Sequence, residues 1–260
     1  MLGLLLGFGV LACAGQPDYV LVTVSGHCLD CVFEDYNPEY LAAEGAADSV
    51  AAVLEEDGSS VETWSYGDDY ETPQDTGNRV PVTGFVDLVD DLETLRDDWV
   101  DGQDDATRVV VLCHSHGCVW AHTALHVVDD LPVRVLIDLD AVSDGWEDDD
   151  ATFGAGDEWA SIIDADGRQW PFDIADAADA WDIPGQNVYL DVEDVIPDSV
   201  RVNLEVWSDG SLVWDEEPNV RLDGSSDDVL LLRADEGHSE VDDVGSDALD
   251  WVSGELASAL

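Results

Sequence analysis

Lysine is absent from the 260-residue sequence, and the only basic side chains besides histidine are eight arginines. Sixty-one Asp and Glu residues oppose them, so the formal net charge is −53. A surface of this sign repels phosphate backbones and anionic membranes, which excludes nucleic-acid binding. Such charge also keeps a protein hydrated in concentrated salt, where screening weakens the self-repulsion, and we therefore expect a halophilic or marine source.

Repeats of the length that builds solenoids or propellers are also absent. Acidic residues are interleaved with apolar ones throughout the chain, whose apolar content is 45% and which includes ten tryptophans. A chain of this length and composition can bury one large core. We therefore predict a folded protein with an acidic shell rather than a disordered chain.

The amino-terminal apolar run is too short to span a bilayer. Residues 2–12 have the length of the apolar part of an export signal, although no Lys or Arg precedes them. The ending Val10 to Cys13 resembles the bacterial lipobox, which implies lipidation of Cys13. We predict an export segment over residues 1–17 and a periplasmic or cell-surface protein whose membrane contact is this anchor. An apolar first strand of the domain is the alternative.

Residues 109–126 contain a strand, a tight turn and a helix in immediate succession. The run from Val109 to Cys113 is β-prone, His114 to Gly117 forms the turn, and helix-compatible residues follow from Cys118. A serine at such an apex points its hydroxyl out of the carboxyl end of the strand, beside the amide groups that begin the helix. Ser115 is therefore the candidate nucleophile.

This pattern resembles the nucleophile elbow G-x-S-x-G of α/β-hydrolases, with Gly117 in the second glycine position and Cys113 in the first. The resemblance extends over about residues 18–260 and implies a serine hydrolase with a histidine base and a carboxylate. It also implies an oxyanion hole formed by two backbone N–H groups. The alternative interpretation is a serine in an ordinary turn of a parallel α/β fold.

Strands and helices alternate along the rest of the chain. Strands are predicted at 19–25, 61–66, 109–113, 200–207 and 229–232 and within 133–142, where the strand ends just before Asp140. Helices are predicted at 39–57, 85–100, from 118 onward and at 248–260. This alternation predicts an α/β fold with a mostly parallel central sheet flanked by helices and ligands at the carboxyl ends of the strands. Residues 18–260 form one domain. The aromatic-rich residues 144–185, an insertion after the strand at 133–142, resemble a lid or form a surface excursion.

Two further positions complete the candidate site that the resemblance implies. His238, in the loop between the last strand and the last helix, is the candidate general base. Asp140, just past the end of the strand that begins at Val133, is the first candidate for the acid, and Asp144 and Asp209 are alternatives. The chain order of serine, acid and histidine is that of α/β-hydrolases.

The candidate oxyanion-hole donors are the backbone N–H of His116 and that of His27 or Cys28, which follow the first predicted strand. Four cysteines other than Cys13 make an even set, which predicts disulfide pairing of some kind in an exported protein: Cys28, Cys31, Cys113 and Cys118. With His27, His114 and His116 they also offer an alternative zinc cluster. We predict no metal and no cofactor, because the elbow needs these residues for its backbone geometry.

Together these features predict an exported serine hydrolase that cleaves carboxylic esters of a small molecule or lipid through an acyl-enzyme. An amidase or a thioesterase with the same three residues is an alternative. A non-catalytic binding protein that retained the fold is another, and the cysteine in the first elbow position favours it. The survival of Ser115 and His238 at their separate positions favours catalysis. The sequence indicates no oligomeric state.

Overall fold

The computed structural model describes residues 16–26, 39–67, 84–142, 181–182, 189–209 and 218–260. Six parallel strands form the central sheet in the order β10-β8-β4-β3-β1-β2. Their bounds are β1 (Tyr19–Val24), β2 (Val61–Tyr66), β3 (Arg108–His114), β4 (Val133–Leu139), β8 (Val200–Trp207) and β10 (Val229–Arg233). This sheet confirms the predicted α/β fold class.

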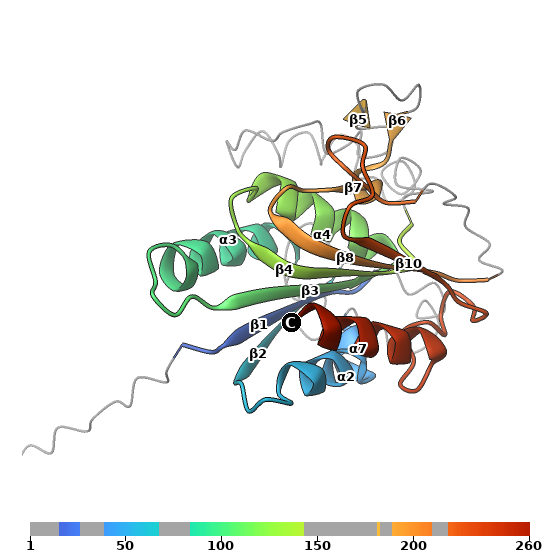
Figure 1. Cartoon of the computed structure of the whole chain (residues 1–260), viewed down its shortest axis with the longest axis horizontal. Coiled ribbons are helices and arrows are strands. Elements are labelled where there is room, and N and C mark those ends of the chain that lie inside the picture. Colours follow the sequence, from blue (N-terminus) through green and yellow to red (C-terminus); the bar gives the residue numbers. More distant parts are fainter. Residues whose placement is uncertain (1–15, 27–38, 68–83, 143–180, 183–188, 210–217) are drawn as a thin grey trace, which may run out of the picture.

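Helices cover both faces of the sheet (Figure 1). They are α1 (Tyr40–Ala43), α2 (Ala46–Leu54), α3 (Phe85–Leu95) with a π-helical turn η2 (Arg96–Val100), α4 (His116–Val127) and α7 (Asp247–Ala259). The connection through α2 leads toward one edge of the sheet, whereas those through α3 and α4 lead the other way. Right-handed crossovers therefore place α3 and α4 on one face and α2 on the other, together with α7.

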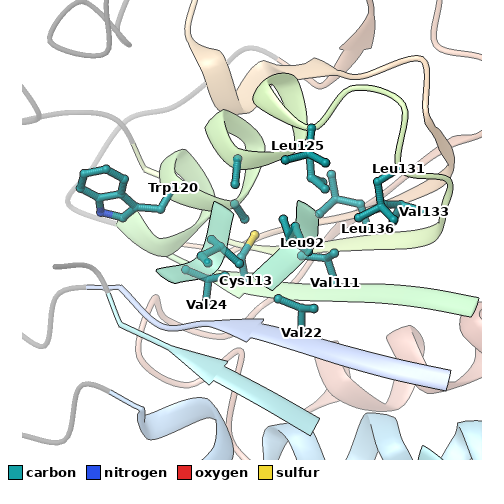
Figure 2. Packing of buried hydrophobic residues seen from close by; sticks show 14 of the residues in the cluster. Val22, Val24, Leu92, Val111, Cys113, Trp120, Leu125, Leu131, Val133 and Leu136 are labelled. Atoms are coloured by element: carbon teal, nitrogen blue, oxygen red, sulfur yellow. The ribbon is translucent and has the colours of Figure 1, made fainter. Parts of the chain in front are cut away.

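Side chains of β3 alternate between two apolar cores. Val109, Val111 and Cys113 pack in the core beneath α3 and α4, whereas Val110 and Leu112 pack in the core with α2 and α7. Figure 2 shows part of the first core, in which side chains of β1 and β3 meet those of α3 and α4. Burying each such side chain contributes about 1.5–3 kcal/mol, so the centre of the sheet is a firm support for the residues at its carboxyl edge.

Short elements that the sequence did not predict lie beside the sheet: β5 (Trp181–Asp182), β6 (Tyr189–Leu190), a 3₁₀ turn η4 (Val192–Asp194), β7 (Val195–Ile196) and β9 (Val220–Arg221). Apart from residues 181–182, the predicted insertion at 144–185 lies outside the described residues, as do residues 1–15 of the predicted export segment. Among the helices in the described ranges, none is long and apolar enough to cross a membrane.

Two predicted boundaries were wrong. The helix expected at 39–57 is two helices, because Gly45 has a φ of 99° and interrupts it. The helix after the elbow begins at His116 rather than Cys118, directly behind Ser115. The strand that begins at Val133 ends at Leu139, just before Asp140 as predicted, and Asp140, with a φ of 47°, leaves the extended conformation.

Candidate active site

The candidate site lies where the order of the strands reverses. The chain passes from β1 to β2 in one direction and from β3 to β4 in the other, so the crevice at the carboxyl ends of β1 and β3 is the switch point of the sheet. In open α/β sheets this crevice is where ligands bind. Gly26 follows β1 at this point, and Ser115 follows β3.

Ser115 occupies the apex between β3 and α4. Its φ of 57° and ψ of −138° are unusual for a residue with a Cβ, and it directly precedes the first residue of α4, His116. Its backbone N–H donates to the carbonyl of Leu139 at 3.1 Å, and its own carbonyl accepts from Cys118 at 3.0 Å. These bonds hold a strained turn of the kind that exposes a nucleophile in front of the amide groups of a helix N-terminus.

Two glycines allow β1 to approach this turn closely. A Cβ on Gly117 would lie 2.3 Å from the carbonyl oxygen of Val24, and one on Gly26 would lie 2.8 Å from the amide nitrogen of His116. Only glycine fits at such distances. The chain therefore leaves β1 directly beside the amide of His116, one of the predicted oxyanion-hole donors. The other two candidates, His27 and Cys28, lie outside the described residues.

The structure brings Ser115, His238 and Asp140 together in one hydrogen-bonded series. The Oγ of Ser115 lies 2.9 Å from Nε2 of His238, and Nδ1 of the same ring lies 2.5 Å from Oδ2 of Asp140. The carboxylate can only accept, so Nδ1 carries a proton and Nε2 is left to accept the hydroxyl proton of the serine. The side chain of His238 is 27% exposed and that of Asp140 is 8% exposed, so the base is open to solvent and the acid is covered.

Asp140 is held by Ser208 as well as by His238. The backbone N–H of Ser208 donates to Oδ1 at 2.7 Å, and its hydroxyl donates to Oδ2 at 2.6 Å. Burial raises the pKa of Asp140, but the hydrogen bonds from His238 and Ser208 outweigh it and hold the pKa below its ordinary value. Asp140 is therefore a carboxylate at neutral pH and can stabilise a protonated His238.

Of the other two predicted acids, Asp209 is not at this position. It is exposed, and its backbone N–H donates to the carbonyl of Glu236 at 2.9 Å. Asp144 lies outside the described residues. Ser208 was not predicted, although its place directly after β8, at the same edge of the sheet, is a signal that could have singled it out.

A second layer of side chains lies behind the base. The ring of His114 stacks on that of His238, with centroids 4.7 Å apart and an interplanar angle of 29°. Its Nε2 lies 2.8 Å from the backbone carbonyl of His238, and its Nδ1 is hydrogen-bonded to the hydroxyl of Tyr40. The sequence predicted none of these contacts of His114, because Tyr40 and His238 are both distant from it in the chain.

Cys113 and Cys118 form a disulfide that encloses the elbow. The pair lies within 4.8 Å of a carboxylate oxygen of Asp138, the one group of potential metal ligands found among the described residues. Zinc binds cysteine as the thiolate, and a disulfide offers none, so the described part of the alternative zinc cluster does not fit the metal. Cys28, Cys31 and His27 lie outside the described residues.

Asp138 is the centre of a separate buried network. Its Oδ1 lies 3.0 Å from Nε2 of His122, and its Oδ2 accepts from the side-chain amides of Asn203 at 2.6 Å and Asn219 at 2.8 Å. The other nitrogen of His122, Nδ1, lies 3.4 Å from the carbonyl of Val195. This network lies beneath α4, on the face of the sheet that α4 covers, whereas Asp140 lies past the carboxyl end of β4.

The parallel sheet, the elbow and the chain order Ser115, Asp140, His238 are together those of an α/β-hydrolase. The fold predicted from the sequence is therefore confirmed in the part of the chain that the structure describes.

No family model matches the sequence, and no curated protein does. Several solved structures are similar to it at low identity. The Pyrococcus furiosus esterase Pf2001 is 12% identical, with a TM-score of 0.49, over 94% of this chain and 80% of that one. Est1E from Butyrivibrio proteoclasticus is 14% identical, with a TM-score of 0.46, over 94% of this chain and 88% of that one. The thioesterase domain from the curacin biosynthetic pathway is 13% identical, with a TM-score of 0.42, over 93% and 92% of the two chains. Identities this low carry no activity over to this chain.

Proposed function

We propose that this protein is a serine hydrolase that cleaves carboxylic ester bonds through an acyl-enzyme. The observation that supports this proposal best is the series of hydrogen bonds from Ser115 to His238 to Asp140. Each member supplies what the chemistry needs: a hydroxyl at the apex of the elbow, a base within hydrogen-bond reach of it, and a carboxylate that orients the base.

In this mechanism the Oγ of Ser115 attacks the ester carbonyl carbon while its proton passes to Nε2 of His238. The carbonyl oxygen becomes an oxyanion beside the backbone N–H of His116, at the positive end of α4. The tetrahedral intermediate collapses, and the leaving alcohol takes the proton from His238. Water then attacks the acyl-enzyme by the same steps, with His238 again accepting and returning a proton, and releases the acid.

The test is labelling with an uncharged fluorophosphonate probe, followed by hydrolysis of p-nitrophenyl esters. We expect the wild-type protein to be labelled once and Ser115→Ala to lose both labelling and hydrolysis, because the nucleophile is removed. Ser253→Ala is the control, since Ser253 lies on α7 with its hydroxyl bonded to the carbonyl of Leu249 at 2.8 Å. Labelling that persists in Ser115→Ala would contradict the assignment.

The same measurement distinguishes the alternatives. A folded protein that neither reacts with the probe nor hydrolyses esters would be the non-catalytic binding protein. Comparison of kcat/KM for an ester, a thioester and an anilide with the same acyl group would distinguish an esterase from a thioesterase or an amidase, because all three reactions use the same residues.

We also propose that the chain is exported, as the apolar residues 2–12 and Cys13 indicate. The buried disulfide between Cys113 and Cys118 supports this, since disulfides persist in oxidising compartments and are rare in reducing ones. Fractionation of cells that produce the full chain would test it. Recovery of the protein in the cytosolic fraction with its amino terminus intact would contradict it.

A further inference from the structure

His114, the residue before Ser115, joins three parts of the site. Its ring is 4% exposed and lies between the ring of His238 and the hydroxyl of Tyr40 on α1. The same hydroxyl accepts a hydrogen bond from the backbone N–H of Gly26 at 3.0 Å. One buried series therefore runs from Gly26, beside the amide of His116, through Tyr40 and His114 to the backbone of His238.

The chemistry of the groups determines the direction of every bond in this series. The carbonyl of His238 can only accept, so Nε2 of His114 carries a proton and donates to it. Nδ1 of a neutral ring with its proton on Nε2 has a lone pair, so it accepts from the hydroxyl of Tyr40, which itself accepts from Gly26. A neutral ring that is protonated on Nε2 satisfies all of these bonds at once.

Burial keeps His114 in that neutral form. Desolvation, with the neighbouring His238 as a smaller contribution, lowers the pKa of His114 to about 3. His114 therefore carries no charge while His238 gains and loses a proton during catalysis, and it is not itself a second base. Its contacts with His238 are a flat stacked face and one hydrogen bond to the main chain, both of which restrict where the loop of His238 can lie.

We infer that His114 and Tyr40 are positioning residues that hold His238 with its Nε2 toward Ser115. The inference rests on the proposed function, since positioning matters only if His238 is the base. The backbone carbonyl of His238 accepts a hydrogen bond from His114, and His114 directly precedes Ser115 in the elbow. The distance between Nε2 and Oγ is thereby tied to the geometry of the turn itself.

The test compares His114→Phe, Tyr40→Phe, the double variant and His114→Gln. His114→Phe keeps a flat ring and removes both hydrogen bonds, so kcat and the rate of fluorophosphonate labelling fall together by roughly tenfold to a hundredfold, with KM nearly unchanged. Tyr40→Phe costs about threefold to tenfold, since it removes the bond to His114 and the one from Gly26 but keeps the bond from His114 to the carbonyl of His238. His114→Gln retains a donor for the carbonyl and recovers part of the loss.

The double variant distinguishes positioning from general destabilisation. If Tyr40 acts through His114, Tyr40→Phe adds nothing once His114 is Phe, whereas independent structural effects would multiply. His126→Phe is the matched control, because His126 is also buried and its Nε2 lies 2.9 Å from a backbone carbonyl, that of Val195. It should lower the melting temperature about as much as His114→Phe does and leave kcat unchanged.

Two results would overturn the inference: a kcat of His114→Phe equal to that of the wild type, or losses in the double variant that multiply. If His114→Phe does not fold, Tyr40→Phe and His114→Gln decide the question by the same kcat and labelling rates, and unchanged rates in both would overturn it. Failure of the proposed function is distinguishable, because the wild-type protein would then not be labelled at all, or Ser115→Ala would still be labelled.

Discussion

Asp138 and Asp140 lie two positions apart at the end of β4, and each is hydrogen-bonded to a histidine. Asp138 is a residue of β4 itself, with its side chain 1% exposed beneath α4, and the side chain of His122 on α4 is fully buried. Asp140 is one residue past the strand, and its partner His238 is 27% exposed. Both aspartates also accept hydrogen bonds from other donors, two asparagine amides for Asp138 and Ser208 for Asp140.

The two pairs differ in what the second ring nitrogen of the histidine meets. That of His238 lies 2.9 Å from the hydroxyl of Ser115, whereas that of His122 lies 3.4 Å from the carbonyl of Val195. A hydroxyl can give up a proton and become a nucleophile, but a carbonyl cannot. A buried histidine–aspartate pair is therefore no sign of catalysis by itself. Position at the carboxyl edge of the sheet, and a serine within reach, make the difference.

Asp140→Asn should produce the largest effect on activity. The amide leaves the imidazole of His238 in the wrong tautomer, so we expect kcat to fall on the order of a thousandfold or more, with little change in melting temperature. Ester hydrolysis and thermal unfolding of the purified variant would measure both. Asp209→Asn is the matched control, because this carboxylate is exposed at the next strand end, and it should cost much less than tenfold. Equal losses in the two variants would remove Asp140 from the proposed mechanism.

Asp138→Asn should produce the opposite pattern. Its amide would place a donor against donors from His122, Asn203 or Asn219, and each buried polar group left unsatisfied costs about 1–3 kcal/mol. We expect the melting temperature to fall by roughly 10 °C and kcat of the folded protein to change little. Differential scanning calorimetry would measure the melting temperature. Steady-state kinetics would give kcat, normalised to the amount of Ser115 that a fluorophosphonate probe labels. A large fall in normalised kcat would show that the two pairs are coupled.

Asp242 extends the comparison to a buried aspartate that ionises with difficulty. Burial, with Asp243 and Glu44 adding to it, raises its pKa from 3.8 to about 6. Between these values the folded state holds a proton that the unfolded state has lost, so stability from this group falls as the pH rises. We expect Asp242→Asn, which cannot ionise, to be more stable than the wild type by on the order of 2 kcal/mol at about pH 8 and by little at about pH 4.

Melting temperatures at the two pH values and constant ionic strength would measure this difference. Asp129→Asn is the control for the loss of one surface charge, because its side chain is exposed and it is not among the groups that raise the pKa of Asp242. A pH-independent difference for Asp242→Asn would mean that the carboxylate is better solvated than its burial indicates.

The sequence predicted the parts of this site that local patterns encode. The β-prone run before Ser115, the tight turn and the following helix define the elbow within ten residues, and the six strands of the sheet lie where hydrophobic patterns placed them. The position of His238 followed from the resemblance to α/β-hydrolases, applied to the order of strands and helices. A boundary failed where one backbone conformation decided it, as at Gly45.

Contacts between distant segments could not be predicted in this way. Asp140 and Asp209 both follow strands, and only the order of the strands and the turn at Asp140 determine which of them meets His238. The pairing of Tyr40 with His114 depends on how α1 packs beside the elbow, and no periodicity in the sequence reports that. The partners of the four cysteines were likewise left open, and the disulfide between Cys113 and Cys118 emerges only from their positions on β3 and α4.

Ser208→Ala should have the smallest effect of these changes. It removes the hydroxyl that donates to Oδ2 of Asp140, whereas the backbone N–H that donates to Oδ1 stays, as does the bond to His238. Losing one hydrogen bond to a carboxylate that keeps its other donors should lower kcat by about tenfold or less. The pKa of Asp140 should rise, because the Ser208 hydroxyl contributes to holding it down. Steady-state kinetics across the acidic pH range would measure both.

Ser208→Thr and Asn203→Ala complete this comparison. Threonine retains the hydroxyl, so kcat should return toward the wild-type value. Asn203 donates to Asp138, in the buried pair beneath α4, as Ser208 donates to Asp140. Asn203→Ala should therefore lower the melting temperature and leave kcat unchanged. If Ser208→Ala were as damaging as Asp140→Asn, the hydroxyl would be required to orient the acid. If it had no effect while Asn203→Ala lowered kcat, the division would be wrong between a catalytic pair, His238 and Asp140, and a structural pair, His122 and Asp138.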